Sequence, residues 1–515
     1  MSFAVLVCDL VFITTIDMFY MIISKLFHYA ALCTLVTVVA TGARVVYNLY
    51  AHPLSRFPGP KTWAASRMRW AHAMQSGSYH QQLHDLHEEY GPVVRIAPNE
   101  LSYVAADAWK DIYSNPKIPK NRVWAGQEEE HHPISIVSID EATHLRNRRA
   151  LAGAFTEHAI TEHSFILEDL VATMIERFKD ATTAGEGSVV VDLGDWMNFL
   201  TFDISGELSF GDTFGCIKNG RAHPWVAISC GFGKGIALMA SINFFSPLNR
   251  ILKLVMPKQV MKKMDYHKQI SHEKFEQRLA MEHKRKAQDY VGSILAYNEE
   301  KGEEMIRKEE LEANMTLLIF AGSETTSTAL TAILTQLLQN TTALAKAQHE
   351  VRSAFDSEND IMVSSVGHLK YLDAVIQEGI RMGPPAAVGL PRVTPREGAL
   401  ILGQHVPGGT FVSVNQYPTF RSTSNFMQSA TFKPERFLED SPFPEDRLDA
   451  FEPFLLGRHK CIGQKLAWSI MRLTLARLLF TFDMKIVDGI EDFGNQKTYI
   501  FWEKRPLKVE IRKSM

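Results

Sequence analysis

The order of apolar and polar residues predicts a chain dominated by helices. Apolar positions three or four residues apart recur over 140–180, 264–299, 308–340, 341–356, 368–383 and 463–480. Short segments with alternating or β-branched residues lie at 92–104, at 399–414 and within 481–515, where we expect strands. The pattern therefore predicts a mainly α fold with a small β part.

The segment 308–340 is the most informative of these helices. It contains no proline and is apolar on both sides of a polar island, AGSETT, at 321–326. A buried Glu324 and its neighbouring hydroxyls require hydrogen-bond partners, because an unpaired buried polar group is costly. Gly322 costs the helix about 1 kcal/mol relative to alanine. An unfavourable centre in so long a helix indicates a functional site there.

The N-terminus has the pattern of a membrane anchor. Leu26 to Ala43 carries no Asp, Glu, Lys or Arg and would span ~27 Å as a helix, close to the thickness of a bilayer core. Residues 2–24 are also apolar but contain Asp9 and Asp17, so they form either a second membrane or interfacial segment or part of one tilted anchor. A buried core helix is the alternative. Basic residues follow the span, which places the rest of the chain in the cytosol.

Three prolines between residues 53 and 60 predict a stiff connection between this helix and the body. We therefore expect an anchor at 1–50, a proline-rich tether at 51–60 and a folded body at 61–515. A chain of 515 residues exceeds one ordinary hydrophobic core, so the body should be subdivided. The net charge of −3 argues against a nucleic-acid partner.

Cysteine usage points to one position. The five cysteines are widely spaced and include no CxxC pair, which argues against a disulfide scaffold and a structural zinc site. Cys461 lies in the loop FLLGRHKCIG at 454–463, directly before an amphipathic helix. Gly457 and Gly463 allow the backbone to approach a flat partner closely. The helix N-terminus and the nearby Arg458 and Lys460 favour a thiolate.

Four motifs together resemble those of cytochrome P-450 monooxygenases. They occur in the order and at the spacings typical of that family, over about residues 50–515: AGxETT at 321–326, ExxR at Glu378 and Arg381, PERF at 434–437, and FxxGxxxCxG at Phe454, Gly457, Cys461 and Gly463. Each motif alone is weak. The combination implies the P-450 fold, preceded by a transmembrane helix, and a domain at 61–515 that binds haem b.

The resemblance implies roles for the residues on both sides of the haem. Cys461 would be the proximal thiolate ligand of the iron, with Phe454 packed beside it. On the opposite side, Glu324 and Thr325 would organise the water and proton relay to dioxygen. Ala321 and Gly322 would leave room for dioxygen in the helix groove.

The same resemblance assigns charged residues. Glu378, Arg381 and Arg436 would form a buried structural ion network. Cations would bind the haem propionates, and the expected set is His144, Arg148 and Arg392.

Two positions of the cysteine loop depart from the family pattern. His459 stands where the family usually has arginine, and Leu455 stands where it usually has a small residue. A neutral histidine is a weaker partner for a carboxylate than arginine, and its charge changes near physiological pH. The affinity for haem and its pH dependence are therefore in question, and Arg458 is a candidate to compensate.

The electron supply is expected to be separate, because no GxGxxG fingerprint opens a βαβ unit. The resemblance implies electrons from a membrane-bound NADPH reductase, with cytochrome b5 as an optional second donor, at the endoplasmic reticulum membrane. Arg458, Lys460 and Lys465 would form a basic docking face for an acidic partner.

The substrate is expected to be lipophilic, because the positions that line the pocket by resemblance are apolar: Trp124, Leu317, Ile319, Phe320, Ala386, Ala387, Val388, Ile500 and Phe501. The segments NLYAHPLSRFPGP and Gly389–Pro395 resemble fungal secondary-metabolism members such as trichothecene C-15 hydroxylases. That resemblance favours a terpenoid, polyketide or alkaloid intermediate.

Two other functions were weighed against oxygen insertion. A haem-thiolate isomerase or dehydratase would need neither dioxygen nor a reductase, but such enzymes often lose the acid–alcohol pair that is present here at 324–325. A non-catalytic haem-binding membrane protein would retain the core without turnover, which the complete motif set disfavours.

Overall fold

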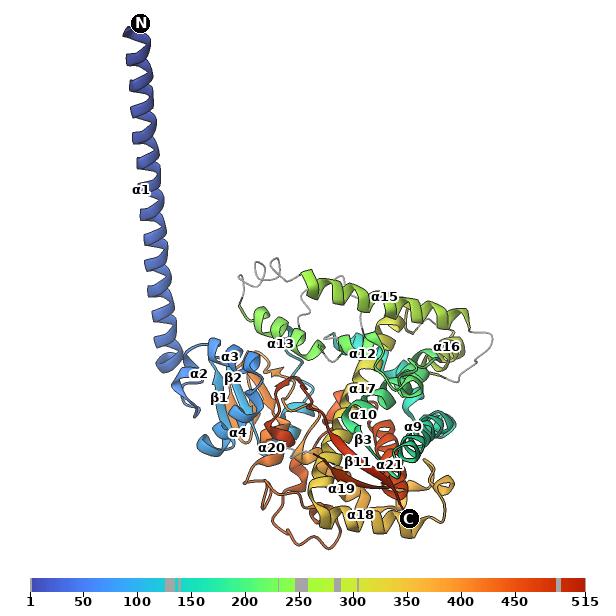
Figure 1. Ribbon diagram of the computed structural model, residues 1–515. Coiled ribbons are helices and arrows are strands. Elements are labelled where there is room, and N and C mark those ends of the chain that lie inside the picture. Colours follow the sequence, from blue (N-terminus) through green and yellow to red (C-terminus); the bar gives the residue numbers. More distant parts are fainter. Residues whose placement is uncertain are drawn as a thin grey trace.

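A long N-terminal helix projects from the body in the computed structural model (Figure 1). The structure describes residues 2–125, 135–137, 140–229, 231–245, 258–281, 289–302, 305–487 and 492–514. Helix α1 spans Ser2–Val46 and continues into a π-helical turn at Tyr47–Ala51. Both apolar N-terminal runs thus belong to one helix. The helical segment Met18–Ala51 contains an 18-residue window with a mean hydropathy of 1.7 and is apolar and long enough to cross a membrane.

The proline-rich segment after α1 is packed onto the body. Leu54 and Phe57 are buried in an apolar cluster with the first strands. The Pro58 carbonyl accepts a hydrogen bond from the Arg95 backbone at 2.7 Å. A Cβ at Gly59, where φ is +150°, would lie 2.6 Å from the Arg95 carbonyl, so the close approach requires glycine. The proline-rich connection predicted at 51–60 is therefore packed onto the body at Leu54 to Gly59.

The expected small β part consists of short strands beside α1 and near the C-terminus (Figure 1). The largest sheet has the order β1 (Val93–Ala97), β2 (Glu100–Tyr103), β7 (Phe411–Val414) and β4 (Arg392–Val393); β2 and β7 are parallel, and the other pairs are antiparallel. The remaining pairings are β3 (Ser188–Asp192) and β8 (Phe482–Ile486) with β11 (Lys508–Lys513), β5 (Ala399–Ile401) with β6 (Gln404–Val406), and β9 (Thr498–Tyr499) with β10 (Phe501–Trp502).

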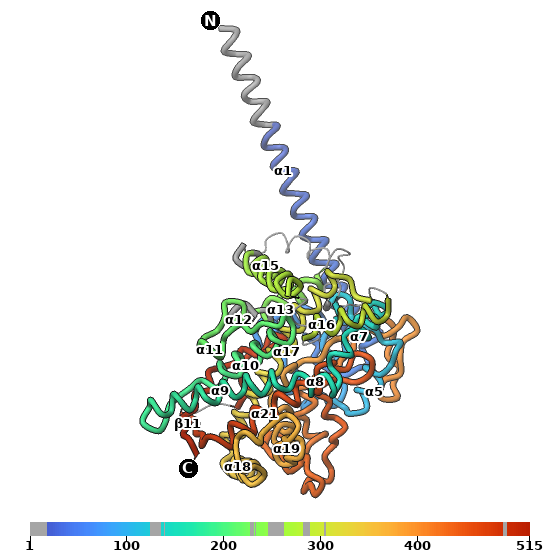
Figure 2. Tube along the Cα trace, turned by 90° about the vertical axis from the view of Figure 1, so that its right-hand side faces the viewer, coloured from blue at the N-terminus to red at the C-terminus, as the bar shows by residue number. Residues whose placement is uncertain are grey.

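The helical part surrounds α17, Lys308–Gln339, which passes through the body (Figures 1 and 2). Helices α10 (Leu193–Phe210), α19 (Lys370–Met382) and α21 (Gln464–Thr481) pack against it, because apolar residues occur all around its second half. The other helices are α2 (Lys61–Ala65), α3 (Met68–Ser76), α4 (Tyr79–Tyr90), α5 (Asp107–Tyr113), α6 (Arg122–Ala125), α11 (Cys216–Asn219), α12 (Pro224–Ser229), α13 (Phe232–Asn243), α18 (Thr341–Ala354) and α20 (Gln416–Arg421).

Two predicted helices are interrupted by capping residues. The segment 140–180 forms α7 (Glu141–Ala152), α8 (Glu157–Glu162) and α9 (Ser164–Ala184), with Thr156 accepting a hydrogen bond from the Ala159 N–H at the start of α8. The segment 264–299 forms parts of α15 (Lys258–Ala280) and α16 (Tyr290–Lys301), with Asp289 as the N-cap of α16. The apolar pattern continues across these positions, so by itself it does not show where a capping side chain begins a new helix. The mainly α prediction is confirmed.

Candidate active site

The cysteine loop is held in a tight backbone conformation before α21. The Cys461 N–H donates to the Phe454 carbonyl at 2.9 Å, and the Lys460 N–H donates to the Gly457 carbonyl at 3.1 Å. Gly457 has φ of +70°, and a Cβ there would lie 2.5 Å from the Tyr113 carbonyl. Leu455 also has a positive φ, 61°, a conformation that a small residue adopts at lower cost. The departure at Leu455 therefore adds backbone strain to the loop.

Helix α7 contacts this loop through two of its side chains. Arg148 Nη1 donates to the Lys460 carbonyl at 2.7 Å, and His144 Nε2 lies 3.3 Å from the Arg458 carbonyl. The rings of His144 and His459 are 4.2 Å apart, centroid to centroid. The structure thus brings the two predicted α7 cations to the cysteine loop.

One cavity joins the cysteine loop to the centre of α17. Cys461 and Thr325 both line it, together with mostly apolar residues from several elements: Thr326, Ala329, Ile380, Pro385, Ala386, Val388, Gly389, Leu390, Gln416, Pro453, Phe454, Leu455, His459, Ala467 and Met471. The thiol and the helix hydroxyl lie far apart in the sequence and face the same space. This arrangement suits a flat apolar group between them.

The residues of the polar island of α17, at 321–326, face in two directions. The Thr325 hydroxyl donates to the Ala321 carbonyl at 2.6 Å, on the side of the helix where Ala321 is exposed. Gly322 faces α10, where a Cβ would lie 3.1 Å from Ser205 Oγ. Glu324 is buried and lies 3.1 Å from Lys504 Nζ. Thr325 borders the cavity, whereas Glu324 is not among the described residues that line it.

Two side-chain nitrogen atoms with incomplete hydrogen bonding lie at one edge of the cavity. Arg392 Nε and His459 Nδ1 are both buried, and neither atom has a hydrogen-bond partner within the described part of the chain. Burial lowers the pKa of Arg392, and burial together with Arg392 and Lys120 lowers the pKa of His459 to about 2. Buried polar atoms in this state require a hydrogen-bond partner, and the Arg392 guanidinium favours an anionic one. They therefore fit the carboxylates of a haem.

Lys120 belongs to the same edge and was missed by the sequence reasoning. It forms an isolated β-bridge with Arg392, and its ammonium donates to the Val137 carbonyl at 3.3 Å. Burial and the charge of Arg392 lower the pKa of Lys120 to about 8. Its only sequence signal is a basic residue just before the predicted pocket segment, so the β-bridge was needed to find it.

Several features around Cys461 shift the pKa of its thiol in opposite directions. Burial raises the pKa of Cys461, while the Gly463 backbone N–H and the charges of Arg148 and Lys460 lower it. The cysteine therefore faces the cavity with positive charge nearby. A bound cation would favour the thiolate further, because metal coordination deprotonates a thiol.

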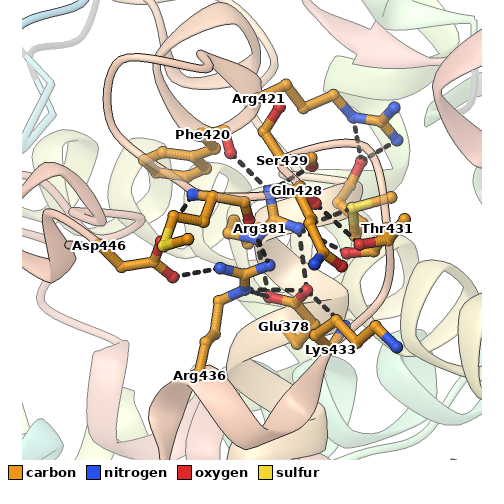
Figure 3. Close-up of polar contacts among 12 residues, drawn as sticks. Glu378, Arg381, Phe420, Arg421, Gln428, Ser429, Thr431, Lys433, Arg436 and Asp446 are labelled. Carbon is orange, nitrogen blue, oxygen red and sulfur yellow. Dashed lines mark hydrogen bonds and ion pairs between the residues drawn. The ribbon is translucent and has the colours of Figure 1, made fainter. Parts of the chain in front are cut away.

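The structure also brings the three network residues together (Figure 3). Arg381 donates to both Glu378 oxygens, at 2.7 and 2.8 Å, and Arg436 Nε donates to Glu378 Oε1 at 3.2 Å. Arg436 also pairs with Asp446, a partner that the sequence did not identify. The side chains of all four are at most 1% exposed.

The predicted pocket residues are dispersed. Val388 and Ala386 line the cavity. Ile319 and Ala387 are buried in core clusters, and the Trp124 side chain lies outside the described residues. Phe501 packs edge-on against Phe320 with ring centroids 4.9 Å apart, and Ile500 precedes it with φ of +84°. A β-branched residue rarely adopts that conformation, so the β9–β10 turn is strained at its tip.

Comparisons with known proteins identify the family of this chain. The model of the cytochrome P450 family matches residues 58–511. The cytochrome P450 monooxygenase astJ of Aspergillus oryzae is 38% identical over 476 residues, which are 91% of this chain and 94% of that protein. The cytochrome P450 monooxygenase atr2 of Stereocaulon alpinum is 37% identical, with 95% and 96% covered. The averantin hydroxylase of Dothistroma septosporum is 37% identical, with 91% and 88% covered.

The chain belongs to the cytochrome P450 family. It is a haem-thiolate monooxygenase, as are its relatives in fungal secondary metabolism, and an isomerase or a non-catalytic haem protein is not favoured. The family uses haem b, dioxygen and electrons from a reductase. When bound, the haem supplies the oxygen chemistry, and a cysteine ligand tunes it.

Proposed function

We propose that this enzyme oxidises a lipophilic intermediate of secondary metabolism, a terpenoid, polyketide or alkaloid. The observation that carries the proposal is the cavity between Cys461 and Thr325, whose other lining residues are mostly apolar. A relative that covers most of this chain is an averantin hydroxylase, which supports a substrate of comparable apolar character.

We propose the following roles for the residues around this cavity. Cys461 ligates the haem iron, and Phe454 shields the sulfur. Arg392, His459 and Arg148 hold the propionates with His144, because these side chains meet the cysteine loop or carry unpartnered donors at the cavity edge. Thr325 holds a proton-carrying water against the open side of α17, where its hydroxyl is anchored on Ala321.

We also propose that α1 anchors the enzyme in the endoplasmic reticulum membrane, with the catalytic domain in the cytosol. Its apolar segment from Met18 to Ala51 has none of its most hydropathic window buried, which supports a lipid environment. The electron donor would be a membrane NADPH reductase that docks near the cysteine loop, with cytochrome b5 as an optional second donor. Lys460 is exposed there, while Arg458 and Lys465 pair with Glu141 and Glu157.

Thr325→Ala should reduce coupling about tenfold or more, because general acid–base steps contribute roughly 10²–10⁴-fold when a proton donor is positioned. The measurement is oxidised product formed per NADPH consumed by the full-length enzyme in microsomes containing a fungal reductase. Apolar secondary metabolites would be screened as substrates. Unchanged product per NADPH would contradict the relay role, and turnover of only polar metabolites would contradict the substrate class.

Thr335→Ala is the matched control. Thr335 lies farther along α17 and donates to the Thr331 carbonyl at 2.7 Å, the same local bond that Thr325 makes. It is buried away from the described cavity lining. Coupling in Thr335→Ala should therefore equal that of the wild type.

His459→Arg should strengthen haem retention. With its pKa lowered to about 2, His459 carries no positive charge at neutral pH in the haem-free chain. Arginine is always charged and binds carboxylates with two parallel hydrogen bonds. We expect haem transfer to apomyoglobin to slow by about tenfold, equivalent to about 1.4 kcal/mol. His158→Arg, at an exposed pair with Glu162, is the control; equal rates in both variants would contradict the prediction.

A further inference from the structure

The relay carboxylate Glu324 has an ion-pair partner from the C-terminal part of the chain. Lys504 Nζ lies 3.1 Å from Glu324 Oε1 and also donates to Asn198 Oδ1 and Ser327 Oγ, both at 2.8 Å. The lysine side chain is 9% exposed and that of Glu324 is 3% exposed. The ammonium therefore has an acceptor for each of its three protons, from α10 and α17.

This pairing directs Glu324 away from the cavity. The carboxylate faces α10, where Asn198 shares the same lysine, while Thr325 next to it borders the cavity. Thr328 Oγ1 lies 3.4 Å from the same oxygen, Oε1. The other oxygen, Oε2, is buried without a hydrogen-bond partner among the described residues. A half-satisfied buried carboxylate depends strongly on its one counter-charge.

We propose that Lys504 is a positioning residue that holds Glu324 turned toward α10, and so sets when this carboxylate can serve the proton relay. The inference rests on the proposed relay role of Glu324 and Thr325. Lys504 follows strand β10, whose Phe501 packs on Phe320 of α17. The strand that contacts α17 through Phe501 thus leads directly to the lysine that pairs with Glu324.

The charges near the pair define what its removal should do. A buried carboxyl without a counter-charge holds its proton to a higher pH than in the unfolded chain. Lys504 also affects Asp195, at the start of α10. Burial and the charge of Asp192 raise the pKa of Asp195, and the charge of Lys504 lowers it. Loss of Lys504 therefore affects two carboxyls, and a second substitution at Glu324 is needed to separate them.

The test is a double-mutant cycle of Lys504→Met and Glu324→Gln in the full-length protein, followed by thermal unfolding against pH. A group whose folded form binds its proton more tightly than the unfolded form contributes stability that is lost as pH rises. The Tm of Lys504→Met should therefore fall relative to that of the wild type as the pH rises from about 4.3 to about 8. Adding Glu324→Gln should remove most of this slope, leaving the part that belongs to Asp195.

Two further variants distinguish positioning from simple packing. Lys504→Arg keeps the positive charge and should restore the wild-type pH dependence. Lys234→Met removes an exposed ion pair with Glu503, the residue before Lys504. The side chains of Lys234 and Glu503 are 55% and 50% exposed. The plot of Tm against pH for Lys234→Met should run parallel to that of the wild type. A Lys504→Met curve parallel to the wild type, or a slope unchanged by Glu324→Gln, would overturn the proposal.

A second readout follows the relay itself. With NADPH and a fungal reductase but no substrate, the pH profile of hydrogen peroxide release should move to higher pH by about one unit or more in Lys504→Met. Lys504→Arg should keep the wild-type profile, and an unmoved profile in Lys504→Met would overturn the proposal. The unfolding cycle needs no turnover. If that cycle succeeds while Thr325→Ala leaves coupling unchanged, the ion pair stands and the proposed relay fails.

Discussion

Replacing Cys461 with serine should abolish the red-shifted thiolate Soret band of the reduced, carbon-monoxide-bound protein and reduce monooxygenase activity to background. A serine hydroxyl is a far weaker donor than a thiolate, which is the ligand that favours cleavage of the oxygen–oxygen bond in this family. The chain presents Cys461 to the cavity with Arg148 and Lys460 beside it. The measurement is the difference spectrum of full-length protein purified with haem.

Cys216→Ser provides the matched control. Cys216 is buried, and burial together with the charge of Asp203 raises its pKa to about 12, so it is an inert thiol. This variant should keep the thiolate band. A retained red-shifted band in Cys461→Ser, or its loss in Cys216→Ser alone, would refute the ligand assignment.

Glu378→Gln should destabilise the folded protein by about 3–5 kcal/mol, because it leaves buried guanidinium groups without their shared anion. Glu378 accepts hydrogen bonds from Arg381 and Arg436 and also from the Lys433 backbone at 2.7 Å (Figure 3). Arg436 retains Asp446, so the cost falls most heavily on Arg381. The amide is nearly isosteric and tests the charge, with little change in volume.

The measurements for Glu378→Gln are the ratio of haem to protein and the unfolding temperature of the purified chain. Glu176→Gln removes an ion pair with Lys179 in which the glutamate side chain is 62% exposed, and it should change stability by only about 0.5 kcal/mol. If Glu378→Gln unfolded like Glu176→Gln and retained full haem, the network would not be a structural requirement.

The helical fold and its main chemistry could be predicted because they leave local signals. The apolar period marks α17, and Gly457 and Gly463 on either side of Cys461 mark the cysteine loop. The anchor is also local, since the length and apolar character of a segment identify a membrane span without its neighbours. The helix boundaries were harder to predict. The apolar period continues across Thr156 and Asp289, which are the N-caps of α8 and α16.

The pocket could not be predicted with the same success, because apolar residues in a core and in a cavity have the same sequence pattern. Ile319 and Ala387 are packed in core clusters, while Leu390 and Met471 line the cavity. The difference depends on the direction in which each side chain points once α17, α19 and α21 have packed together.

The sequence by itself determined the family, the cysteine motif, the acid–alcohol motif and an N-terminal segment apolar and long enough to span a membrane, because each depends on residues close together in the chain. Only the tertiary structure decided the partners of these residues. It placed Lys504 beside Glu324 and Asp446 beside Arg436. Such pairs depend on distant segments that meet in a buried, low-dielectric interior, where each charge must find a counter-charge. No local pattern in the chain records which segment will supply it.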